Sequence, residues 1–584
     1  MRRLSLLGLF VPLALAACST PPAPAPRATD GVGMVAAADP RAVDAGLEML
    51  KKGGSATDAA IATMAVLGLV EPQSAGIGGG AFLLNYDRAS KDIDAYDGRE
   101  RAPMGATANL FLGADGKPLP YRDAVWSGLS TGAPSMIAML EKAHADHGRL
   151  PWRDLFEPAI KLAEQGFIVA PRLAGLLQMM GPQSALKQDP VAGKYFYDAN
   201  GAPLTVGARR TNPEYAATLR AIQERGARAL QEGPIADAII AQVRRAPRPG
   251  SMTLADLRNV APRRLDPVCG PYRTYRVCGM GPPSSGAIAT LSTLGLYERA
   301  RPNPVGATSV DDWSAYMWAS RIAYADRDHY AADDQFVPVP TAALTDPRYL
   351  AVRAREIDVA KAPPATIQPG DPSITIGGPS LLDRWGRDRT ADMPGTTHMS
   401  VVDGAGNAVA LTATVESVFG SQRMAAGFLL NNQLTDFSLD PVKNGRPVAN
   451  APAPGKRPRS SMSPTIILDD EGQLYAVIGS PGGSAIIGYV TKTVIGVIDW
   501  KLPMQEAINL ANITARTGVA ATEVNRLPPG VADALTARGW TLRPTQNEAS
   551  GLHCIRVTAH GFDAGADPRR EGVAKSTPST PRGK

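Results

Sequence analysis

The chain begins with two helical patterns followed by two strands. Residues 39–54 (DPRAVDAGLEMLKKGG) carry helix start and stop signals, because Asp39 can cap the first turn and Gly53 can end the last one. Residues 55–70 (SATDAAIATMAVLGLV) predict a second, more buried helix. Strands are then predicted within residues 74–87 and 91–100, with a turn around residues 88–91.

Further along the chain, helical patterns alternate with antiparallel strands. Residues 127–261 are mainly helical. A strand pair is predicted over 264–280, followed by helices over 287–300 and 311–332. Residues 361–395 form an irregular loop that we expect to be exposed. Three hairpins are then predicted over 398–415, 423–432 and 463–480, and a last helix over 484–500. This order predicts an α/β fold of stacked layers, with sheets covered by helices on both sides.

Composition narrows the function classes. The 584 residues are 44% apolar, and the net charge of +6 comes from scattered Lys and Arg, which argues against a nucleic-acid surface. The glycines within 76–80 precede a strand and no GK[ST] follows, so a close backbone crossing is predicted there and a phosphate loop is not. His144 and His147 predict a solvated helix face, and no Cys/His spacing predicts a metal site. No cofactor is predicted.

The N-terminus has the pattern of an export signal. Residues 1–17 combine a basic start with an apolar run too short to cross a bilayer, and LAAC then places small residues before Cys18. This resembles a lipoprotein signal peptide with Cys18 as the lipidated residue; an ordinary secretory signal with an incidental cysteine is the alternative. Residues 18–32 are a Pro/Ala-rich tether. The pattern predicts a periplasmic, lipid-anchored protein, and Ser19 favours the outer membrane.

Two cysteines flank a turn-rich segment in DPVCGPYRTYRVCGM. A hairpin could bring Cys269 and Cys278 together, and an oxidising periplasm would permit a disulfide between them. Two separate buried thiols fit the sequence equally well.

The hairpin after residue 395 brings two threonines together. If Asp403 opposes Ala408 across the GAGN turn, antiparallel pairing places Thr396 opposite Thr414 or Val415, with Glu416 at the same end. A threonine-rich edge exposed to solvent is the alternative interpretation.

Cleavage of the bond between Gly395 and Thr396 would make Thr396 reactive. A threonine hydroxyl needs an adjacent base, and a new α-amine titrates at about 7.7–8.0. Gly395 would give the strained peptide conformational freedom. Thr396 would then be the nucleophile twice, on its own peptide and on substrate. The loop GSPGGS opens a helix, so the N–H groups of Gly482 and Gly483 could stabilise an oxyanion.

Polar residues gather in two further loops. LLNNQLTDF contains Gln433 and Asp436, and KRPRSSMSPT contains Ser460 and Ser461. Acidic and amide groups suit an ammonium, while hydroxyls and arginine suit a carboxylate, so together they suit an α-amino-acid head group. Ordinary turn chemistry is the alternative for each loop.

These blocks resemble, in order and spacing, the γ-glutamyltranspeptidase family. The matching segments are GTTHMSVVDGAGNAVALTATVESVFG, LLNNQLTDF, KRPRSSMSPT, GSPGGS, YDGRERAP, PPSSG and the block from Gly33 to Phe82. The resemblance implies an N-terminal-nucleophile hydrolase fold, a four-layer αββα sandwich. It also implies autocatalytic cleavage into a large subunit (33–395) and a small subunit (396–584) that stay together as a heterodimer.

The resemblance also implies a reaction and residue roles. The enzyme would attack γ-glutamyl amides such as glutathione and pass the γ-glutamyl group to water or to an amino acid or peptide. Thr396 aligns with the nucleophile, Thr414 with the threonine that assists it, and Gly482 and Gly483 with the oxyanion hole. Substrate binding is implied for Arg99, Ser460 and Ser461 at the α-carboxylate and for Glu416, Gln433 and Asp436 at the α-amino group.

Some positions depart from the family pattern. Position 416 is glutamate where many members have asparagine, and Ala485 stands where arginine is common. Residues 438–455 are short and lack tyrosine, which predicts an open site that accepts larger acceptors. Residues 509–524 lack an expected Pro-Arg pair, so no residue is assigned there. The alternatives are a same-fold acylase for glutaryl amides, against which the ammonium ligands argue, and a non-catalytic ligand-binding lipoprotein.

Overall fold

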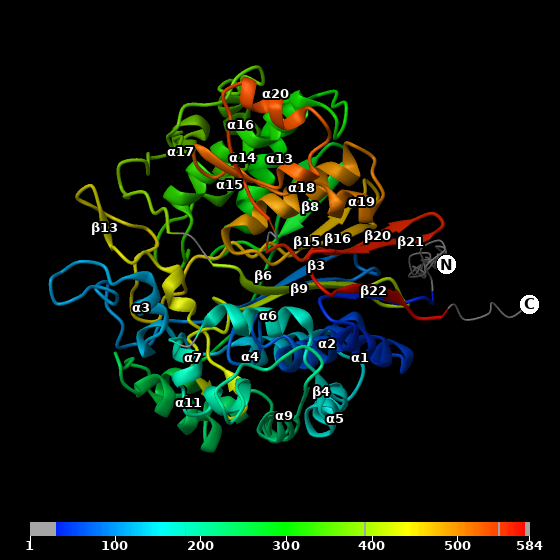
Figure 1. Ribbon diagram of the computed structural model, residues 1–584. Helices are drawn as coiled ribbons and strands as arrows, with labels where there is room; N and C mark the ends of the chain where they lie inside the picture. Colours follow the sequence, from blue (N-terminus) through cyan, green and yellow to red (C-terminus); the bar gives the residue numbers. More distant parts are fainter. Residues whose placement is uncertain (1–30, 182, 391–392, 547–548, 579–584) are drawn as a thin grey trace, which may run out of the picture.

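Two β-sheets lie face to face in the middle of the protein, and helices cover the outer face of each (Figure 1). This computed structural model describes residues 31–578 apart from 182, 391–392 and 547–548. The predicted signal peptide, Cys18 and most of the tether lie outside the described residues. No helix in the described part of the chain is long and apolar enough to cross a membrane.

The first sheet has seven strands in the order β22-β1-β9-β10-β2-β3-β6. In chain order these are β1 (Met34–Ala37), β2 (Gly80–Tyr86), β3 (Ile93–Gly98), β6 (Arg263–Leu265), β9 (Gly395–Val402), β10 (Ala408–Glu416) and β22 (Val573–Ser576). The central strands β2, β9 and β10 are buried on both faces because side chains alternate between two cores: Leu83 packs with one helical layer, and Phe82 and Leu84 pack toward the second sheet.

The helices on the outer face of this sheet follow the sequence prediction. They begin with α1 (Pro40–Lys51) and α2 (Ala56–Val70). The Asp39 side chain accepts a hydrogen bond from the Arg41 N–H and so caps α1, while Ser55 and Asp58 form a capping box for α2. The rest of this layer is α3 (Tyr121–Val125), α4 (Met136–His147), α5 (Glu157–Gln165), α6 (Pro171–Met180), α7 (Ala185–Gln188), α8 (Ala192–Phe196), α9 (Pro213–Arg225), α10 (Arg228–Gln231), α11 (Pro234–Arg244) and α12 (Leu254–Arg258).

The second sheet has six strands in the order β21-β20-β16-β15-β8-β7. They are β7 (Val268–Tyr272), β8 (Tyr275–Gly279), β15 (Thr465–Leu468), β16 (Leu474–Ile478), β20 (His553–Thr558) and β21 (Gly561–Ala566). Its outer layer contains α13 (Gly286–Ala300), α14 (Val310–Tyr330), α15 (Thr341–Leu344), α16 (Pro347–Ala354), α18 (Ile486–Ile498), α19 (Met504–Asn509) and α20 (Val531–Ala537) (Figure 1). Helix, sheet, sheet and helix are the predicted four layers.

Several smaller predictions can be compared with the structure. Cys269 and Cys278 lie opposite each other in β7 and β8 and form a disulfide, which decides between the two alternatives. A close backbone crossing is confirmed at Gly79, where a Cβ atom would lie 2.0 Å from the Thr414 carbonyl oxygen. The solvated helix face is wrong, because His147 Nε2 lies 3.0 Å from an Asp94 carboxylate oxygen on β3.

The segment before β9 is irregular, as predicted, apart from the short helix α17 (Pro372–Ile376). It is not exposed throughout: Asp388 is buried and pairs with Arg459 at 3.0 Å. This ion pair ties the segment to the loop that carries the predicted serines.

Candidate active site

The β9–β10 hairpin places Thr396 directly opposite Thr414, one of the two predicted partners. A bulge follows Thr414, so that Glu416 pairs with Gly395. Glu416 has φ of 79°, a left-handed conformation that is uncommon for a residue with a side chain. Thr396 and Thr414 are buried, which contradicts the solvent-exposed edge.

Hydrogen bonds connect the two threonines with the peptide bond between residues 395 and 396. The Thr396 hydroxyl donates to Thr414 Oγ1 at 3.1 Å, and the Glu416 N–H donates to the same oxygen at 2.8 Å. Thr414 in turn donates its proton to the Gly395 carbonyl oxygen at 2.8 Å. Because a hydroxyl has one proton and two lone pairs, these three bonds fix its orientation. Thr414 therefore links the Thr396 hydroxyl to the carbonyl of the peptide bond that precedes Thr396.

Gly395 is needed here for space. A Cβ atom would lie 2.3 Å from the Glu416 carbonyl oxygen and 2.4 Å from the Ser417 backbone. Gly395 does not have a positive φ. Lack of space for a side chain therefore explains the glycine more directly than the conformational freedom expected from the sequence.

The glycine loop adopts a conformation that suits glycine. Gly482 has φ of 140° and Gly483 has φ of 57°, and the short helix η4 (Gly483–Ala485) leads from them into α18. Neither N–H donates a hydrogen bond to another described residue. A Cβ atom on Gly482 would lie 2.5 Å from the Tyr489 ring. Two backbone donors are therefore available in this loop, and Gly483 lines the same small pocket as Thr396.

An ion pair occupies the other end of the site. The Arg99 guanidinium lies 2.5 Å from Asp436, and both side chains are buried. Arg99 also donates to the Arg459 carbonyl oxygen at 2.7 Å, and Gln433 Nε2 donates to Asp436 at 2.6 Å. Gln433 Oε1 is buried and has no hydrogen-bond partner among the described residues.

Glu416 is held by several donors. It accepts hydrogen bonds from the Met393 N–H at 2.9 Å, from Ser417 Oγ at 2.5 Å, from Tyr121 at 3.3 Å and from Asn432. Burial and the Glu416 charge raise the pKa of Tyr121 well above its usual value, so the tyrosine remains a donor. Tyr121 lies 295 residues from Glu416 and had no sequence signal.

The two serines contact different groups. Ser460 Oγ accepts from the Met462 N–H at 3.1 Å, and Ser461 Oγ accepts from Arg327 at 2.6 Å. Arg327 is a fully buried residue of α14 that sequence reasoning did not single out. It adds positive charge at the end of the site where a carboxylate is expected.

Arg570 is a further residue that the sequence did not assign. It donates to the Thr396 carbonyl oxygen at 3.0 Å and to the Ser550 carbonyl oxygen at 3.1 Å. Burial, together with the nearby Arg172 charge, lowers the pKa of Arg570 to about 9, still high enough to keep it charged at neutral pH. Arg570 lies in the segment ADPRREG, and its contact with Thr396 depends on tertiary structure.

One small pocket collects almost all of the predicted residues. It is lined by Arg99, Met393, Thr396, Thr414, Glu416, Gln433, Asp436, Ser460, Ser461, Met462, Gly483 and Ile486. Gly482 lines the neighbouring pocket instead. We call the first the head-group pocket.

A four-layer αββα sandwich with a buried threonine at the head of a central strand defines an N-terminal-nucleophile hydrolase. The profile of the family described as Gamma-glutamyltranspeptidase matches residues 42–577. The chain therefore belongs to the γ-glutamyltranspeptidase family.

Individual relatives agree with this assignment. The chain is 34% identical to a glutathione hydrolase proenzyme of Bacillus subtilis over 93% of this chain and 91% of the relative. It is 36% identical to one of Escherichia coli over 87% of each chain. The structure of a cephalosporin acylase from Bacillus halodurans matches 96% of this chain and 99% of its own length, with a TM-score of 0.81 at 26% identity.

Proposed function

We propose that this protein is a glutathione hydrolase and γ-glutamyltransferase that matures by cutting itself between Gly395 and Thr396. The observation that carries the proposal is the position of the Thr414 hydroxyl, which bonds both the Thr396 hydroxyl and the carbonyl of that peptide.

Maturation would proceed in two steps, an acyl shift and a hydrolysis. Thr396 Oγ1 attacks the Gly395 carbonyl carbon; an ester bond forms, the C–N bond breaks, and the hydroxyl proton passes to the departing nitrogen. Water then cleaves the ester, leaving a carboxylate on Gly395 and a free α-amine and hydroxyl on Thr396. The large subunit (33–395) and small subunit (396–584) remain together as a heterodimer.

The same hydroxyl would then attack the substrate. The new α-amine accepts the Thr396 proton as a γ-glutamyl ester forms, and the tetrahedral oxyanion accepts hydrogen bonds from the Gly482 and Gly483 N–H groups. The amide C–N bond breaks as the leaving amine takes the proton. Water or an acceptor amine then attacks the ester, releases glutamate or a new γ-glutamyl amide, and restores Thr396.

The head-group pocket suits the two charges of an α-amino acid. We assign the carboxylate to Arg99, with Ser460 and Ser461 beside it, and the ammonium to Glu416, Gln433 and Asp436. A zwitterion would give Arg99 and Asp436 each a new partner of opposite charge, so both stay compensated when the substrate separates them.

The short segment 438–455 bears on the size of the acceptor. It forms the hairpin β13 (Val442–Lys443) and β14 (Arg446–Pro447) and contains no tyrosine. We propose that it leaves the mature site open to larger acceptors. We further propose that the signal peptide 1–17 is removed, that Cys18 is lipidated, and that the tether 18–32 holds the enzyme in the periplasm, with the outer membrane favoured.

A same-fold acylase for glutaryl amides is the second candidate, and the similarity to a cephalosporin acylase structure is the observation in its favour. A glutaryl group has no ammonium, so it would leave the carboxylates of Glu416 and Asp436 without a substrate partner. A non-catalytic lipoprotein would have no use for the paired threonines.

Two measurements test the proposal. On a denaturing gel we expect two bands for the wild type and one for Thr396→Ala, and an intact wild-type chain would contradict self-cleavage. Processed enzyme is then given γ-glutamyl-p-nitroanilide and glutaryl-p-nitroanilide in parallel. Faster release from the γ-glutamyl compound is expected, whereas faster release from the glutaryl compound would assign the acylase function.

A further inference from the structure

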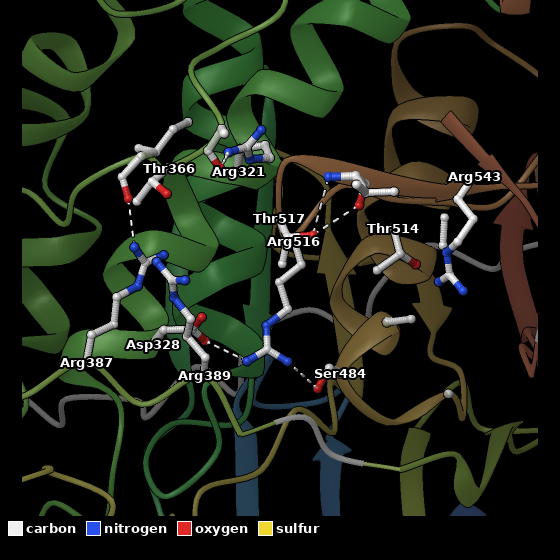
Figure 2. A pocket seen from close by; sticks show the side chains of 16 residues that line it. Arg321, Asp328, Thr366, Arg387, Arg389, Ser484, Thr514, Arg516, Thr517 and Arg543 are labelled. Atoms are coloured by element: carbon white, nitrogen blue, oxygen red, sulfur yellow. Dashed lines mark hydrogen bonds and ion pairs between the residues drawn. The ribbon is translucent and has the colours of Figure 1, made fainter. Parts of the chain in front are cut away.

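A second pocket, which we call the arginine pocket, lies beside the glycine loop (Figure 2). Its cavity volume is about 430 Å³. Its walls carry five arginines and one carboxylate: Arg321 and Asp328 from α14, Arg387 and Arg389 from the segment before β9, Arg516, and Arg543 from β19 (Thr541–Pro544). The neighbouring strands β17 (Ile513–Thr514) and β18 (Val519–Thr522) complete the small-subunit wall.

The positive charges in this pocket are not balanced. Asp328 is shared between Arg327 at 3.1 Å and Arg516 at 3.2 Å. Arg321 donates to the Pro364 and Ala365 carbonyl oxygens, and Arg387 donates to that of Ile367, so these arginines contact neutral acceptors. Within the described part of the chain, Arg321, Arg387, Arg389 and Arg543 form no ion pair.

The arginines also repel one another. Burial and the Arg387 charge lower the pKa of Arg321 to about 10. Burial also lowers the pKa of Arg387. The Asp328 charge opposes this shift, and the Arg389 and Arg516 charges add to it. With a pKa of about 10, Arg321 remains charged at neutral pH. A bound anion would relieve this repulsion and supply the bidentate partner that a guanidinium prefers.

The arginine pocket shares a wall with the head-group pocket. Gly482 lines the first and Gly483 the second, and consecutive Cα atoms are about 3.8 Å apart. Likewise Arg389 lines the first and Met393 the second, and four residues of chain span at most about 14 Å. A dipeptide bonded to the γ-glutamyl group at Thr396 is long enough to reach this distance.

We propose that the arginine pocket binds carboxylates on the far side of the scissile amide, which makes γ-glutamyl peptides with an acidic remainder the favoured donors and acidic peptides the favoured acceptors. The proposal rests on the proposed function, because an amide substrate has a leaving group that is an amine. In an amino acid or peptide, that amine belongs to a molecule that also carries a carboxylate. Because several arginines of the pocket have no ion-pair partner, we expect a leaving group with two carboxylates to bind best.

A matched pair of donors tests the preference. γ-Glutamyl-glutamate has a leaving group with two carboxylates, and γ-glutamyl-glutamine amide has a neutral leaving group of nearly the same shape. Consumption of each by the processed holoenzyme is followed by mass spectrometry. We expect wild type to prefer the acidic donor at least 10-fold in kcat/KM, mainly through KM.

The exposed pair Arg389 and Arg543 provides the variants. Their side chains make no hydrogen bond or ion pair with described residues, so Arg389→Gln with Arg543→Gln should fold normally. We expect this double variant to lower the preference to 3-fold or less, and the double lysine variant to retain most of it. Arg355→Gln, an exposed arginine outside both pockets, is the matched control and should keep the wild-type ratio. A ratio near 1 in wild type, or an unchanged ratio in the double glutamine variant, overturns the proposal.

A binding measurement separates this proposal from the proposed function. N-acetyl-glutamyl-glutamate has three carboxylates and no ammonium, and its affinity for the Thr396→Ala protein is measured by calorimetry. We expect the added Arg389→Gln and Arg543→Gln changes to weaken binding at least 10-fold. Loss of all γ-glutamyl activity in the wild type together with this weakening would refute the proposed function and support the pocket. Unchanged affinity would refute the pocket.

Discussion

The head-group pocket and the arginine pocket share a loop but manage charge in opposite ways. In the head-group pocket, Arg99 and Asp436 are buried and already paired with each other. The arginine pocket is lined by five arginines and one carboxylate, and of these arginines only Arg516 forms an ion pair with it in the described part of the chain. Two of the five, Arg389 and Arg543, are exposed to solvent. The first site is compensated when empty and can exchange its internal partner for a zwitterion. The second has charge to spare, so an anion adds a partner without displacing one.

The largest expected effect lies in the head-group pocket, at Thr414. Thr414→Val removes the hydrogen bond that polarises the Gly395 carbonyl, and we expect self-cleavage to slow by about 100-fold or more. The measurement is the appearance of the small subunit over time. Thr414→Ser keeps the hydroxyl and should restore most of the rate; a serine variant as slow as the valine variant would show that the methyl group matters instead.

The next effect tests whether the head-group charges depend on each other. Asp436→Asn leaves the buried Arg99 without its carboxylate, and breaking such a pair costs about 3–5 kcal/mol. We expect a matching loss in the free energy of unfolding, measured with the Thr396→Ala chain in urea. Arg543→Gln, in the other pocket, should change it by no more than about 0.5 kcal/mol. Equal losses would remove the distinction between the pockets.

A smaller effect concerns pH. Glu100, next to Arg99, is buried, and neither of its carboxylate oxygens has a hydrogen-bond partner among the described residues. Burial raises the pKa of Glu100 to about 8, and the Arg99 charge opposes this shift. The folded state therefore binds this proton more tightly than the unfolded state. The stability contributed by the protonated form is complete below about pH 4.3 and is lost as pH rises toward 8.

Glu100→Gln keeps the neutral form at every pH. We expect the variant to melt at a higher temperature than wild type. Its advantage in the free energy of unfolding should grow by on the order of 3 kcal/mol between pH 5 and pH 8. Arg321→Gln provides the comparison from the arginine pocket: because the pKa of Arg321 is about 10, its effect on stability should stay constant over this range. A Glu100→Gln margin independent of pH would mean that Glu100 is ionised throughout.

The smallest effect is the response to salt. Raising NaCl from about 0.05 to 0.5 M shortens the screening length from about 14 to about 4 Å, which weakens attraction to the more exposed charges first. We expect KM for γ-glutamyl-glutamate to rise about threefold. KM for γ-glutamyl-p-nitroanilide, whose charges meet only the buried pocket, should change much less. A similar rise for both donors would place the salt-sensitive charges in the head-group pocket.

Sequence alone predicted the features that local chemistry fixes. The GAGN turn predicted the register of the hairpin to within one residue. The assumed pairing of Asp403 with Ala408 was wrong by one residue, because Val402 pairs with Ala408. The Asp39 cap of α1 was predicted for the same reason. Contiguous motifs identified most residues of the head-group pocket, because each motif is a loop that ends at the site.

The missed residues depend on long-range packing. Arg570 contacts the carbonyl of a residue 174 positions away. The arginines of the second pocket are scattered over three regions of the chain, and each looks like an ordinary surface charge in its own segment. Residues 509–524 were left without an assignment, yet Arg516 from that segment contacts Ser484 and Asp328. Only the fold shows that these charges converge.

The order of strands has a consequence for the protein after the cut. In the seven-stranded sheet, β22, β9 and β10 come from the chain after Gly395 and alternate with β1 and β2 from the chain before it, and in the other sheet β15 pairs with β8. Each of the two proposed products therefore supplies strands to both sheets, and neither holds a complete sheet. Severing one bond would change the connectivity of the backbone but not the cooperative unit, so the pieces should melt in a single transition and part only by unfolding.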